Sequence, residues 1–410
     1  MPKHSSVAAG CIAAVFLFSD PASAGDQTSK ILIDAAKNLS VANWKTGAAQ
    51  WGARGGPAWS VQLRTLHGGR QEGVQVIEVD NGAMSFTIVP TRGFEVWKAQ
   101  AGKLRLGWDS PVTEIVHPSL IHLEDNAGHG WTNGFGGWMV RGGLASFGDP
   151  VMDGAQQLTL HGHVDYIPAS FVSVHYEAAP VPRLVFRGVM NDAQVFGPQL
   201  RLTSEISTPI GKAEIAFDDT ITNTSDAPQE MEALYHTNFG PPLLGAGAEF
   251  VAPIARVAPM NAISGAGGME GWNRYSGPHA PGYAAQVFTL KLQADARGET
   301  EAMLKSPDGS MGALMKFNVH ELPAMSLWKN EAPARTGYVT GLEPGTGYPY
   351  SRIIERAAGR VPLLKADESY HIHLAISALT SRAEVEAAAA AIGKLAAAEP
   401  VIQKTPLVAP

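Results

Sequence analysis

Short segments of alternating apolar and polar residues, separated by turn residues, most strongly constrain how this chain can fold. The clearest example runs from Val74 to Val79, turns at Asp80-Asn81-Gly82 and continues in alternation to Ile88. An Asn-Gly turn between two alternating segments is typical of a β-hairpin. Comparable segments recur at 94–99, 104–108, 184–190, 200–208, 213–224, 285–293, 301–305, 311–318 and 370–376. The chain is therefore predicted to be built mainly of β-strands.

Helical patterns occur only near the two ends, over 29–38 and 381–398, and the second begins with the capping box Ser381-Arg-Ala-Glu384. With 44 glycines, 28 prolines and no alternation of strands with helices, the sequence predicts an all-β sandwich. The expected organisation is a signal peptide over 1–24, an N-terminal helix and lead-in over 25–70, one sandwich domain over 71–380, and a C-terminal helix with a frayed tail over 381–410.

The first residues are typical of an export signal. Lys3 provides a basic start, an apolar run follows from Val7 to Phe18, and Ala22-Ser-Ala24 has the small residues of a cleavage site. A lipid-attachment site at Cys11 is the alternative, although this cysteine lies inside the apolar run. Cys11 is the only cysteine, so cleavage leaves a protein without a thiol or disulfide. The expected location is the bacterial periplasm or the medium.

The charge balance excludes two classes of partner. The formal net charge is −7, and no run of lysines and arginines occurs. Nucleic acids and anionic membranes attract basic surfaces, so neither is expected to bind. No segment after the signal is apolar enough for a membrane span. The partner expected is a small molecule, and the oligomeric state is left open.

Three stretches carry residues suited to acid–base chemistry. They are Ala233-Leu-Tyr-His-Thr-Asn-Phe-Gly240, Leu160-His-Gly-His163 and Gly341-Leu-Glu-Pro344. Opening a sugar ring requires one group that donates a proton and one that accepts it, and a histidine and a carboxylate can do this near neutral pH. A phosphate-binding loop, a serine elbow and a His-Glu-x-x-His motif are all missing from the sequence, so no cofactor or metal is expected. A metal held by His161 and His163, two residues apart on one strand face, is the alternative, but two ligands are too few.

Several motifs together resemble aldose 1-epimerases (galactose mutarotases), and more closely an uncharacterised family of aldose-epimerase-like proteins. The matching motifs are Pro90-Thr-Arg-Gly93, Leu106-Gly-Trp108, Gly134-Phe-Gly-Gly137, Leu160-His-Gly162, Asp219 to Pro228, Tyr235-His236, Gly247-Ala-Glu249 and Gly341-Leu-Glu-Pro344. The resemblance covers most of residues 70–380 and implies a β-supersandwich of the galactose mutarotase-like type.

The resemblance also implies roles for individual residues. His236 matches the general acid, Glu343 the general base, His161 a second active-site histidine, and Arg92 an arginine that holds sugar hydroxyls. His163 stands where the closer family has arginine, and Tyr-His-Thr-Asn-Phe differs from the Asn-His-x-Tyr-Phe of galactose mutarotases, so the sugar is left open.

The remaining candidate site residues are expected to bind the sugar. Tryptophan faces stack on the C–H surface of sugars, and polar side chains hold hydroxyls. The candidates are Trp131, Trp328, Tyr235, Asn238, Arg141 and His163. The long loops at 108–148 and 265–282 carry many aromatic residues, which either bind a ligand or seal one end of the sandwich.

The function expected from these residues is interconversion of sugar anomers by ring opening. One alternative is a lyase acting by β-elimination, in which Tyr235 or His236 is the base and Arg92 or Arg141 neutralises the developing negative charge. A second alternative is a sugar-binding protein without catalysis. A lyase makes an ultraviolet-absorbing product, an epimerase equilibrates anomers, and a binding protein does neither.

The export signal makes a direct prediction. When the full chain is expressed in a Gram-negative bacterium, the mature protein should begin at Gly25, because Ala22-Ser-Ala24 provides the cleavage site. Mass spectrometry of the periplasmic fraction measures this. A mature protein beginning with lipid-modified Cys11, or an uncleaved chain in the cytoplasm, would contradict it.

Overall fold

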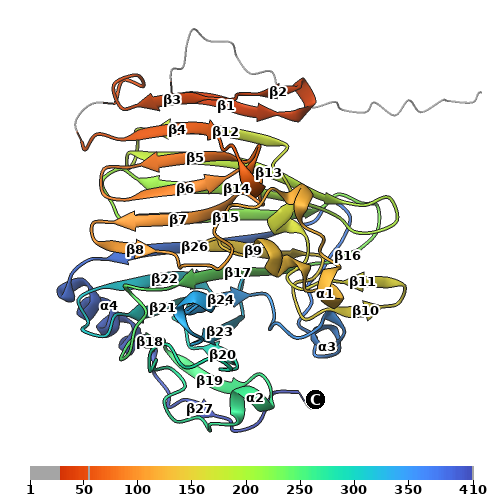
Figure 1. Ribbon diagram of the computed structural model, residues 1–410, viewed down its shortest axis with the longest axis vertical. Helices are drawn as coiled ribbons and strands as arrows, with labels where there is room; N and C mark the ends of the chain where they lie inside the picture. Colours follow the sequence, from red (N-terminus) through yellow and green to blue (C-terminus); the bar gives the residue numbers. More distant parts are fainter. Residues whose placement is uncertain (1–27, 54–55, 409–410) are drawn as a thin grey trace, which may run out of the picture.

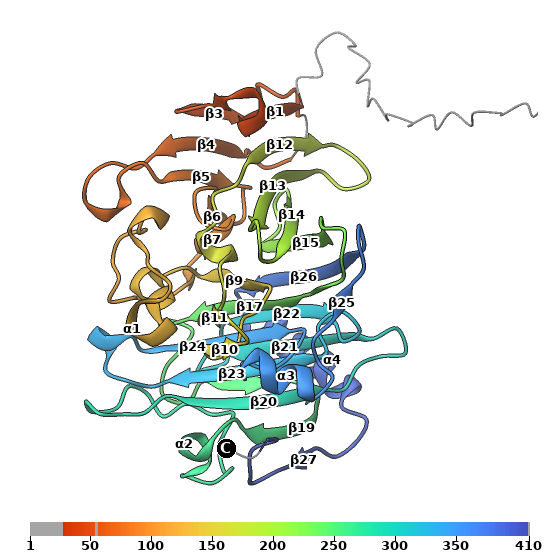
Figure 2. The same ribbon diagram turned by 90° about the vertical axis from the view of Figure 1, so that its right-hand side faces the viewer.

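Two large antiparallel sheets pack face to face over the whole length of the molecule (Figures 1 and 2). The computed structural model describes residues 28–53 and 56–408, so the predicted signal peptide lies outside the described residues. Within the described part, one sheet has ten strands and the other thirteen. The predicted all-β sandwich is thereby confirmed.

The strands of the ten-stranded sheet, in spatial order, are β18 (Glu249–Val251), β21 (Glu299–Lys305), β22 (Gly312–Asn318), β26 (Ser369–Leu379), β15 (Glu214–Asn223), β14 (Gln199–Pro209), β13 (Arg183–Ala193), β12 (Phe171–Glu177), β1 (Ser29–Asp34) and β2 (Leu39–Ser40). Those of the thirteen-stranded sheet are β27 (Val401–Ile402), β19 (Ile254–Pro259), β20 (Gln286–Leu292), β23 (Ala324–Asn330), β24 (Val339–Gly345), β17 (Glu232–Phe239), β9 (Met139–Leu144), β7 (Glu95–Ala101), β6 (Ser85–Val89), β5 (Gln75–Asp80), β4 (Ser60–Thr65) and β3 (Trp44–Gly47), with β8 (Leu104–Leu106) paired to β7.

The smaller elements lie at the ends and in the loops. They are the pairs β10 (Val151–Asp153) with β11 (Gln156–Leu158) and β16 (Gln229–Glu230) with β25 (Leu363–Leu364), the helices α1 (Asp125–Gly128), α2 (Ala262–Gly265), α3 (Arg352–Ala357) and α4 (Arg382–Leu395), and the 3-10 turns η1 (Ala35–Lys37), η2 (Gly69–Gln71), η3 (Pro118–Leu120), η4 (Gly130–Gly134), η5 (Val164–Tyr166) and η6 (Ala334–Thr336). No helix among the described residues is long and apolar enough to cross a bilayer.

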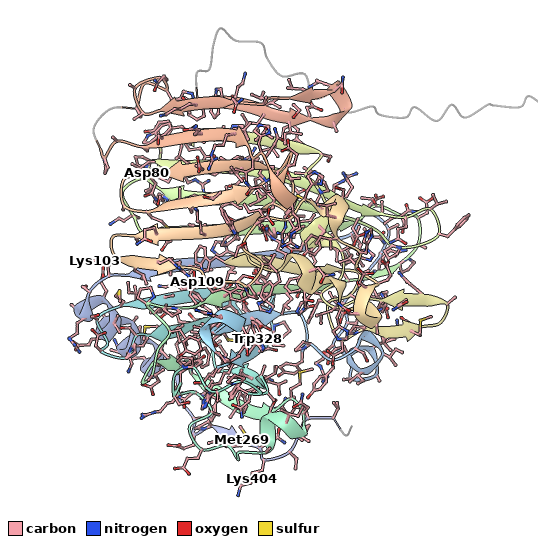
Figure 3. All side chains as sticks on the ribbon, in the orientation of Figure 1. Asp80, Lys103, Asp109, Met269, Trp328 and Lys404 are labelled. Atoms are coloured by element: carbon pink, nitrogen blue, oxygen red, sulfur yellow. The ribbon has the colours of Figure 1, made fainter. Side chains whose placement is uncertain are left out.

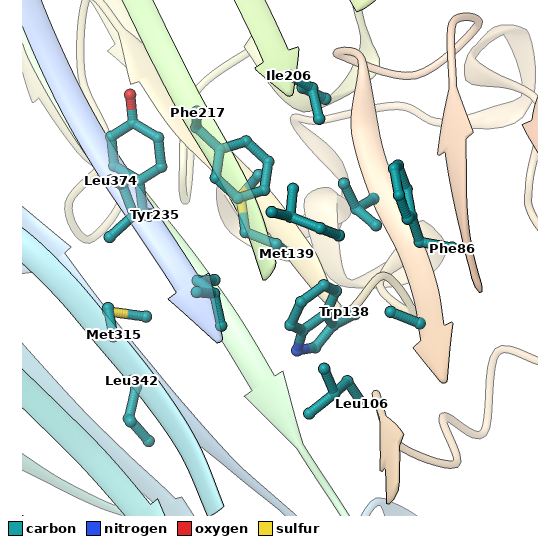
Figure 4. Packing of buried hydrophobic residues seen from close by; sticks show 14 of the residues in the cluster. Phe86, Leu106, Trp138, Met139, Ile206, Phe217, Tyr235, Met315, Leu342 and Leu374 are labelled. Atoms are coloured by element: carbon teal, nitrogen blue, oxygen red, sulfur yellow. The ribbon is translucent and has the colours of Figure 1, made fainter. Parts of the chain in front are cut away.

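Alternating side chains of both sheets meet in one continuous core (Figure 4). Phe217 on β15 and Ile206 on β14 face Phe86 on β6 and Met139 on β9. Because successive side chains of a strand point to opposite faces, every second residue of each strand is left on the outer face of its sheet. That outer face of the thirteen-stranded sheet is the one that positions the candidate site.

Both chain ends differ from the prediction. The helix predicted over 29–38 is wrong, because residues 29–34 form β1, which pairs with β12 and buries Leu32 completely. Local helix propensity is a weak preference that pairing with a sheet edge overrides. The segment 25–70 also supplies β3 and β4 to the other sheet, so it belongs to the sandwich. The C-terminal helix is confirmed as α4 with its capping box, but the tail expected to fray pairs as β27 with β19.

An ion pair joins the two sheets through the core. The Arg141 guanidinium on β9 donates from Nε to Asp219 Oδ2 on β15 at 2.6 Å, and Tyr235 donates its hydroxyl to the same oxygen at 2.7 Å. Arg141 and Tyr235 are paired directly on β9 and β17. Both side chains are almost fully buried between the sheets. They therefore do not reach the outer face, and the prediction that they bind sugar is corrected.

Removing the cation of this pair should destabilise the whole fold. Arg141→Met leaves the Asp219 carboxylate buried without its partner, which costs about 3–5 kcal/mol of unfolding free energy. Denaturant unfolding measures the change, with Arg201→Met on the exposed face of β14 as the control. A loss equal to that of the control would show that the cross-sheet pair does not stabilise the fold.

Candidate active site

The centre of the candidate site is a histidine–carboxylate contact between two neighbouring strands. His236 lies on β17 and Glu343 on β24, which are adjacent in the thirteen-stranded sheet. His236 Nε2 and Glu343 Oε1 are 3.1 Å apart, and both side chains are almost fully buried. Two groups this close leave no room for a sugar ring between them. We refer to these two residues as the His–Glu pair.

Aromatic side chains form the walls around the His–Glu pair. The His236 ring has Phe135 at 5.2 Å, Trp328 at 5.5 Å and Trp131 at 6.0 Å between ring centroids. Trp328 comes from β23, whereas Trp131 and Phe135 come from η4 and the residue after it, in the long loop that lies outside the sheet (Figure 2). Of the two predicted aromatic loops, 108–148 thus supplies side chains to the site, whereas Trp272 of 265–282 packs against Phe250 and Phe288. Trp328 is partly exposed beside His236, and Trp131 is almost fully buried.

His161 completes the cluster, with its ring 5.2 Å from that of His236 and nearly perpendicular to it. Its backbone φ is +56°, a value that residues other than glycine seldom adopt and that often marks functional positions. If its Nδ1 carries the proton, it donates to the carbonyl of Phe147 at 3.1 Å, which leaves Nε2 as an acceptor. Burial lowers the pKa of His161 to about 4, so the ring is neutral near pH 7.

Burial also determines the charge of the His–Glu pair. It raises the pKa of the Glu343 carboxyl to about 8. Burial, together with the neighbouring His161, lowers the pKa of His236 well below its usual value of 6.5. At neutral pH the carboxyl therefore keeps its proton, while the imidazole is neutral and carries a proton on only one of its two nitrogens. These protonation states are the reverse of the roles expected from the sequence, in which His236 was the acid and Glu343 the base.

Two polar atoms of the pair have no hydrogen-bond partner among the described residues. They are Glu343 Oε1, whose approach to Nε2 lacks hydrogen-bond geometry, and His236 Nδ1. Buried polar atoms in proteins are nearly always hydrogen-bonded, so unpaired ones point to a ligand or a functional role. The pair thus has the capacity to bind hydroxyl groups.

Gly341 is a residue of the site that sequence reasoning did not single out. It lies two residues before Glu343, on the same face of β24, and is paired with Asn238 on β17. A Cβ atom at this position would collide with Glu343 Oε1 and come within 3.1 Å of His236 Cε1. The motif Gly-Leu-Glu therefore needs its glycine because the His–Glu pair occupies that space. The signal in the sequence was the spacing of two between the glycine and the glutamate.

Asn238 and Arg92 support the site from behind. Asn238 is fully buried, and its amide donates to the Gly137 carbonyl at 3.1 Å; its side chain raises the pKa of His236 by less than burial lowers it. Arg92 is 1% exposed, faces the carboxylates of Glu95 and Asp165, and donates to the Gly134 carbonyl at 3.0 Å. These contacts occupy both side chains, and the expectation that they hold sugar hydroxyls stays a prediction.

His163 is also separated from the cluster. Residues 160–163 form a turn instead of a strand, so His161 and His163 do not share a face. His163 lies beside Asp192, with Nδ1 and Oδ1 3.4 Å apart, and is excluded from the predicted sugar contacts. Within 28–53 and 56–408, no cluster of three or more His, Cys, Asp or Glu residues could hold a metal ion.

The all-β sandwich with a buried His–Glu pair on its outer face belongs to the galactose mutarotase-like class of folds. A Klebsiella pneumoniae protein, described provisionally as an aldose 1-epimerase, is similar over 93% of this chain and 99% of its own, with 33% identity and a TM-score of 0.90. A galactose mutarotase-like protein from Clostridium acetobutylicum aligns over 82% of this chain and 98% of its own, with 12% identity and a TM-score of 0.51. These likenesses confirm the predicted fold type.

Residues 71–378 match the family described as a domain of unknown function, DUF4432, and the chain belongs to that family. The family assignment agrees with the resemblance found in the sequence. No curated protein matches the chain.

Burial of Glu343 predicts a cost in stability that depends on pH. The folded state keeps this proton up to about pH 8, whereas the unfolded chain releases it near pH 4.5. Stability contributed by the protonated carboxyl is therefore lost progressively as pH rises between these values, by about 4 kcal/mol in all. Glu343→Gln removes this loss because an amide does not ionise.

The variant Glu343→Gln should unfold at a higher temperature than the wild type at pH 8, and the gain should disappear near pH 4.5. Calorimetric unfolding between pH 4 and 9 measures this. Glu386→Gln, on the exposed face of α4, serves as the control and should show no such trend. A gain of the same size at both pH values would contradict the buried, protonated carboxyl.

Proposed function

We propose that this protein interconverts the anomers of a sugar, by acid–base opening and closing of the ring at the His–Glu pair. The observation that carries the proposal is the 3.1 Å separation of His236 Nε2 and Glu343 Oε1 inside an aromatic enclosure. The similarity to the Klebsiella protein supports the same reaction class.

The short separation of His236 Nε2 and Glu343 Oε1 matches the close spacing of the two sugar oxygens that react. In a cyclic sugar, the ring oxygen and the anomeric hydroxyl are bonded to the same carbon, so they lie close together on one edge of the molecule. A donor and an acceptor about as close as a hydrogen-bonded pair can address both oxygens from that edge at once. The sugar therefore does not need to enter between the two side chains.

The protonation states give each group its role. The Glu343 carboxyl donates its proton to the ring oxygen, and the bond between that oxygen and the anomeric carbon breaks with its electrons moving to the oxygen. His236 Nε2 accepts the proton of the anomeric hydroxyl, so that a carbonyl forms. The resulting carboxylate and imidazolium stabilise each other at 3.1 Å. Rotation of the open chain followed by the reverse transfers gives the other anomer and restores the pair.

The surrounding side chains position the sugar for these transfers. Trp328, which is partly exposed, offers an apolar face for its C–H surface, and the buried Trp131 packs on Phe135 and His161 behind it. His161 Nε2, an acceptor in the tautomer that donates to Phe147, can bind a further hydroxyl. The same aromatic side chains exclude water, which keeps the His–Glu pair uncharged until the sugar reacts.

The positions of the arginines disfavour the lyase alternative. β-Elimination requires a cation that neutralises the developing negative charge. Arg92 is already paired with Glu95 and Asp165, and Arg141 with Asp219, so neither of the two arginines considered for this role is directed at the His–Glu pair. A binding protein without catalysis would have no use for two buried groups with strongly shifted pKa values, a feature that clusters at catalytic sites.

Anomer exchange should depend on both members of the His–Glu pair. His236→Ala and Glu343→Gln should each lower kcat/KM by roughly 10²–10⁴, because each removes one proton-transfer group. Exchange spectroscopy by proton NMR on free glucose, galactose and related aldoses measures the rate. His163→Ala, which alters a histidine beside Asp192, is the matched control and should keep full activity.

The same measurement gives the pH profile. Activity should fall above about pH 8, where Glu343 loses its proton, and at acidic pH well below 6.5, where His236 gains one. An unsaturated product absorbing in the ultraviolet would favour the lyase. Sugar affinity without turnover would favour the binding protein. Full turnover by both pair variants would refute the assignment of the site.

A further inference from the structure

A groove of about 520 Å³ lies beside the candidate active site and has no role in the proposal above. It runs over β5, β6, β7 and β8 and ends against the start of the long loop that covers the site. Its principal lining side chains are Thr87, Trp97, Lys98, Gln100, Trp108 and Asp109. Asp109, which lines the groove, and Trp328, whose ring packs against that of His236, are both labelled in Figure 3.

The groove and the His–Glu pair occupy the same face of the thirteen-stranded sheet. On β7, Val96 and Ala99 point into the core between the sheets, so Lys98 points outward. On β17, Tyr235 belongs to that core and His236 packs with the outer aromatic cluster. Only β9 separates β7 from β17. A chain-like ligand could therefore extend from one site to the other along this face.

Two aromatic side chains in contact, with their ring planes tilted by 46°, form the boundary between the sites. Trp108 lines the groove and packs on Phe135 with ring centroids 4.9 Å apart. Phe135 in turn lies 5.2 Å from the His236 ring. Trp108 is half-buried, and its indole nitrogen donates to the Gly137 carbonyl at 3.3 Å, which holds the ring in this position. The groove thus begins where the wall of the active site ends.

The chemistry of the lining indicates the class of ligand. Trp108 offers aromatic surface, Trp97 lies beneath the Lys98 ammonium, which is 4.5 Å from its ring centroid, and Thr87 and Gln100 offer hydroxyl and amide groups. This combination fits the mixed apolar and polar surface of a sugar. The charges of the lining are balanced, since Lys98 and Arg105 offset Glu78 and Asp109, and Arg105 pairs with Asp109 at 2.8 Å. An uncharged ligand is therefore favoured over an acidic one.

The size of the groove indicates more than one sugar unit. Its volume of about 520 Å³ falls within the roughly 300–1,000 Å³ of small-molecule sites and exceeds the need of a single ring. We propose that the groove binds the non-reducing units of a neutral oligosaccharide whose reducing end reaches the His–Glu pair. The placement of the reducing end at the His–Glu pair rests on the proposed function, whereas binding in the groove does not depend on turnover.

The test compares sugars of different length on the wild type and on groove variants. The probes are glucose, maltotriose and cellotriose, galactose and β-1,4-galactotriose, and the acidic trigalacturonate. Isothermal titration measures binding to Glu343→Gln and to the wild type, and proton NMR measures anomer exchange by the wild type. At least one neutral trisaccharide should bind at least tenfold more tightly than its monosaccharide, and trigalacturonate should bind more weakly than that trisaccharide.

Substitutions of groove residues test whether the trisaccharide binds in the groove. Trp97→Ala and Gln100→Ala should each weaken binding of the neutral trisaccharide at least tenfold and leave monosaccharide exchange unchanged. Gln62→Ala is the matched control, because Gln62 pairs with Glu78 from β4 and does not line the groove. Since Trp97 is partly buried, thermal unfolding must show that the variant folds, and Gln100→Ala at an exposed position gives an independent result.

The outcomes separate this inference from the proposed function. Trisaccharide binding that the groove variants abolish, without anomer exchange by the wild type, would retain the groove and refute the epimerase. Anomer exchange with equal affinity for mono- and trisaccharides would retain the epimerase and refute the groove. Failure of every neutral trisaccharide to bind, tighter binding of trigalacturonate, or binding unaffected by both groove variants would also overturn the inference.

Discussion

The site depends on removing one imidazole and one carboxyl from water together. Inside the aromatic enclosure, the charged form of either group is unfavourable, so the proton that the His–Glu pair holds stays on Glu343 while His236 remains neutral. In water the same two groups would both be charged between about pH 4.3 and 6.5. The enclosure, more than the identity of the residues, therefore determines which group donates and which accepts.

The enclosure itself is held by buried polar contacts behind it. Arg92 donates to the carbonyl of Gly134, and Tyr166 donates its hydroxyl to the carbonyl of Trp131 at 2.6 Å. Both acceptors belong to η4, whose side chains form one wall of the site. A loop anchored in this way can keep aromatic groups at fixed distances from His236 without being part of a sheet. An arginine expected to touch the sugar thus acts on the loop instead.

Local patterns in the sequence predicted the fold well where they reflect strand alternation, as in the hairpin β5–β6, and where a cap marks a helix, as in α4. They failed at residues 29–38, where the partner strand β12 lies far away in the chain. For the site, motif resemblance predicted His236, Glu343 and His161 as one cluster. It could not predict their contact distance or burial, the two properties on which the proposed roles of these groups rest.

The difference between neighbouring residues of one strand explains why Tyr235, and Arg141 paired with it, were wrongly included in the predicted site. Tyr235 and His236 are adjacent in the motif, but they point to opposite faces of β17. Only His236 points to the outer face, where it meets Glu343. Tyr235 is held in the core by Asp219, which also binds Arg141. A slip of one residue would exchange the two faces. The cross-sheet ion pair therefore does more than stabilise the sandwich, because it selects the register that places His236 opposite Glu343.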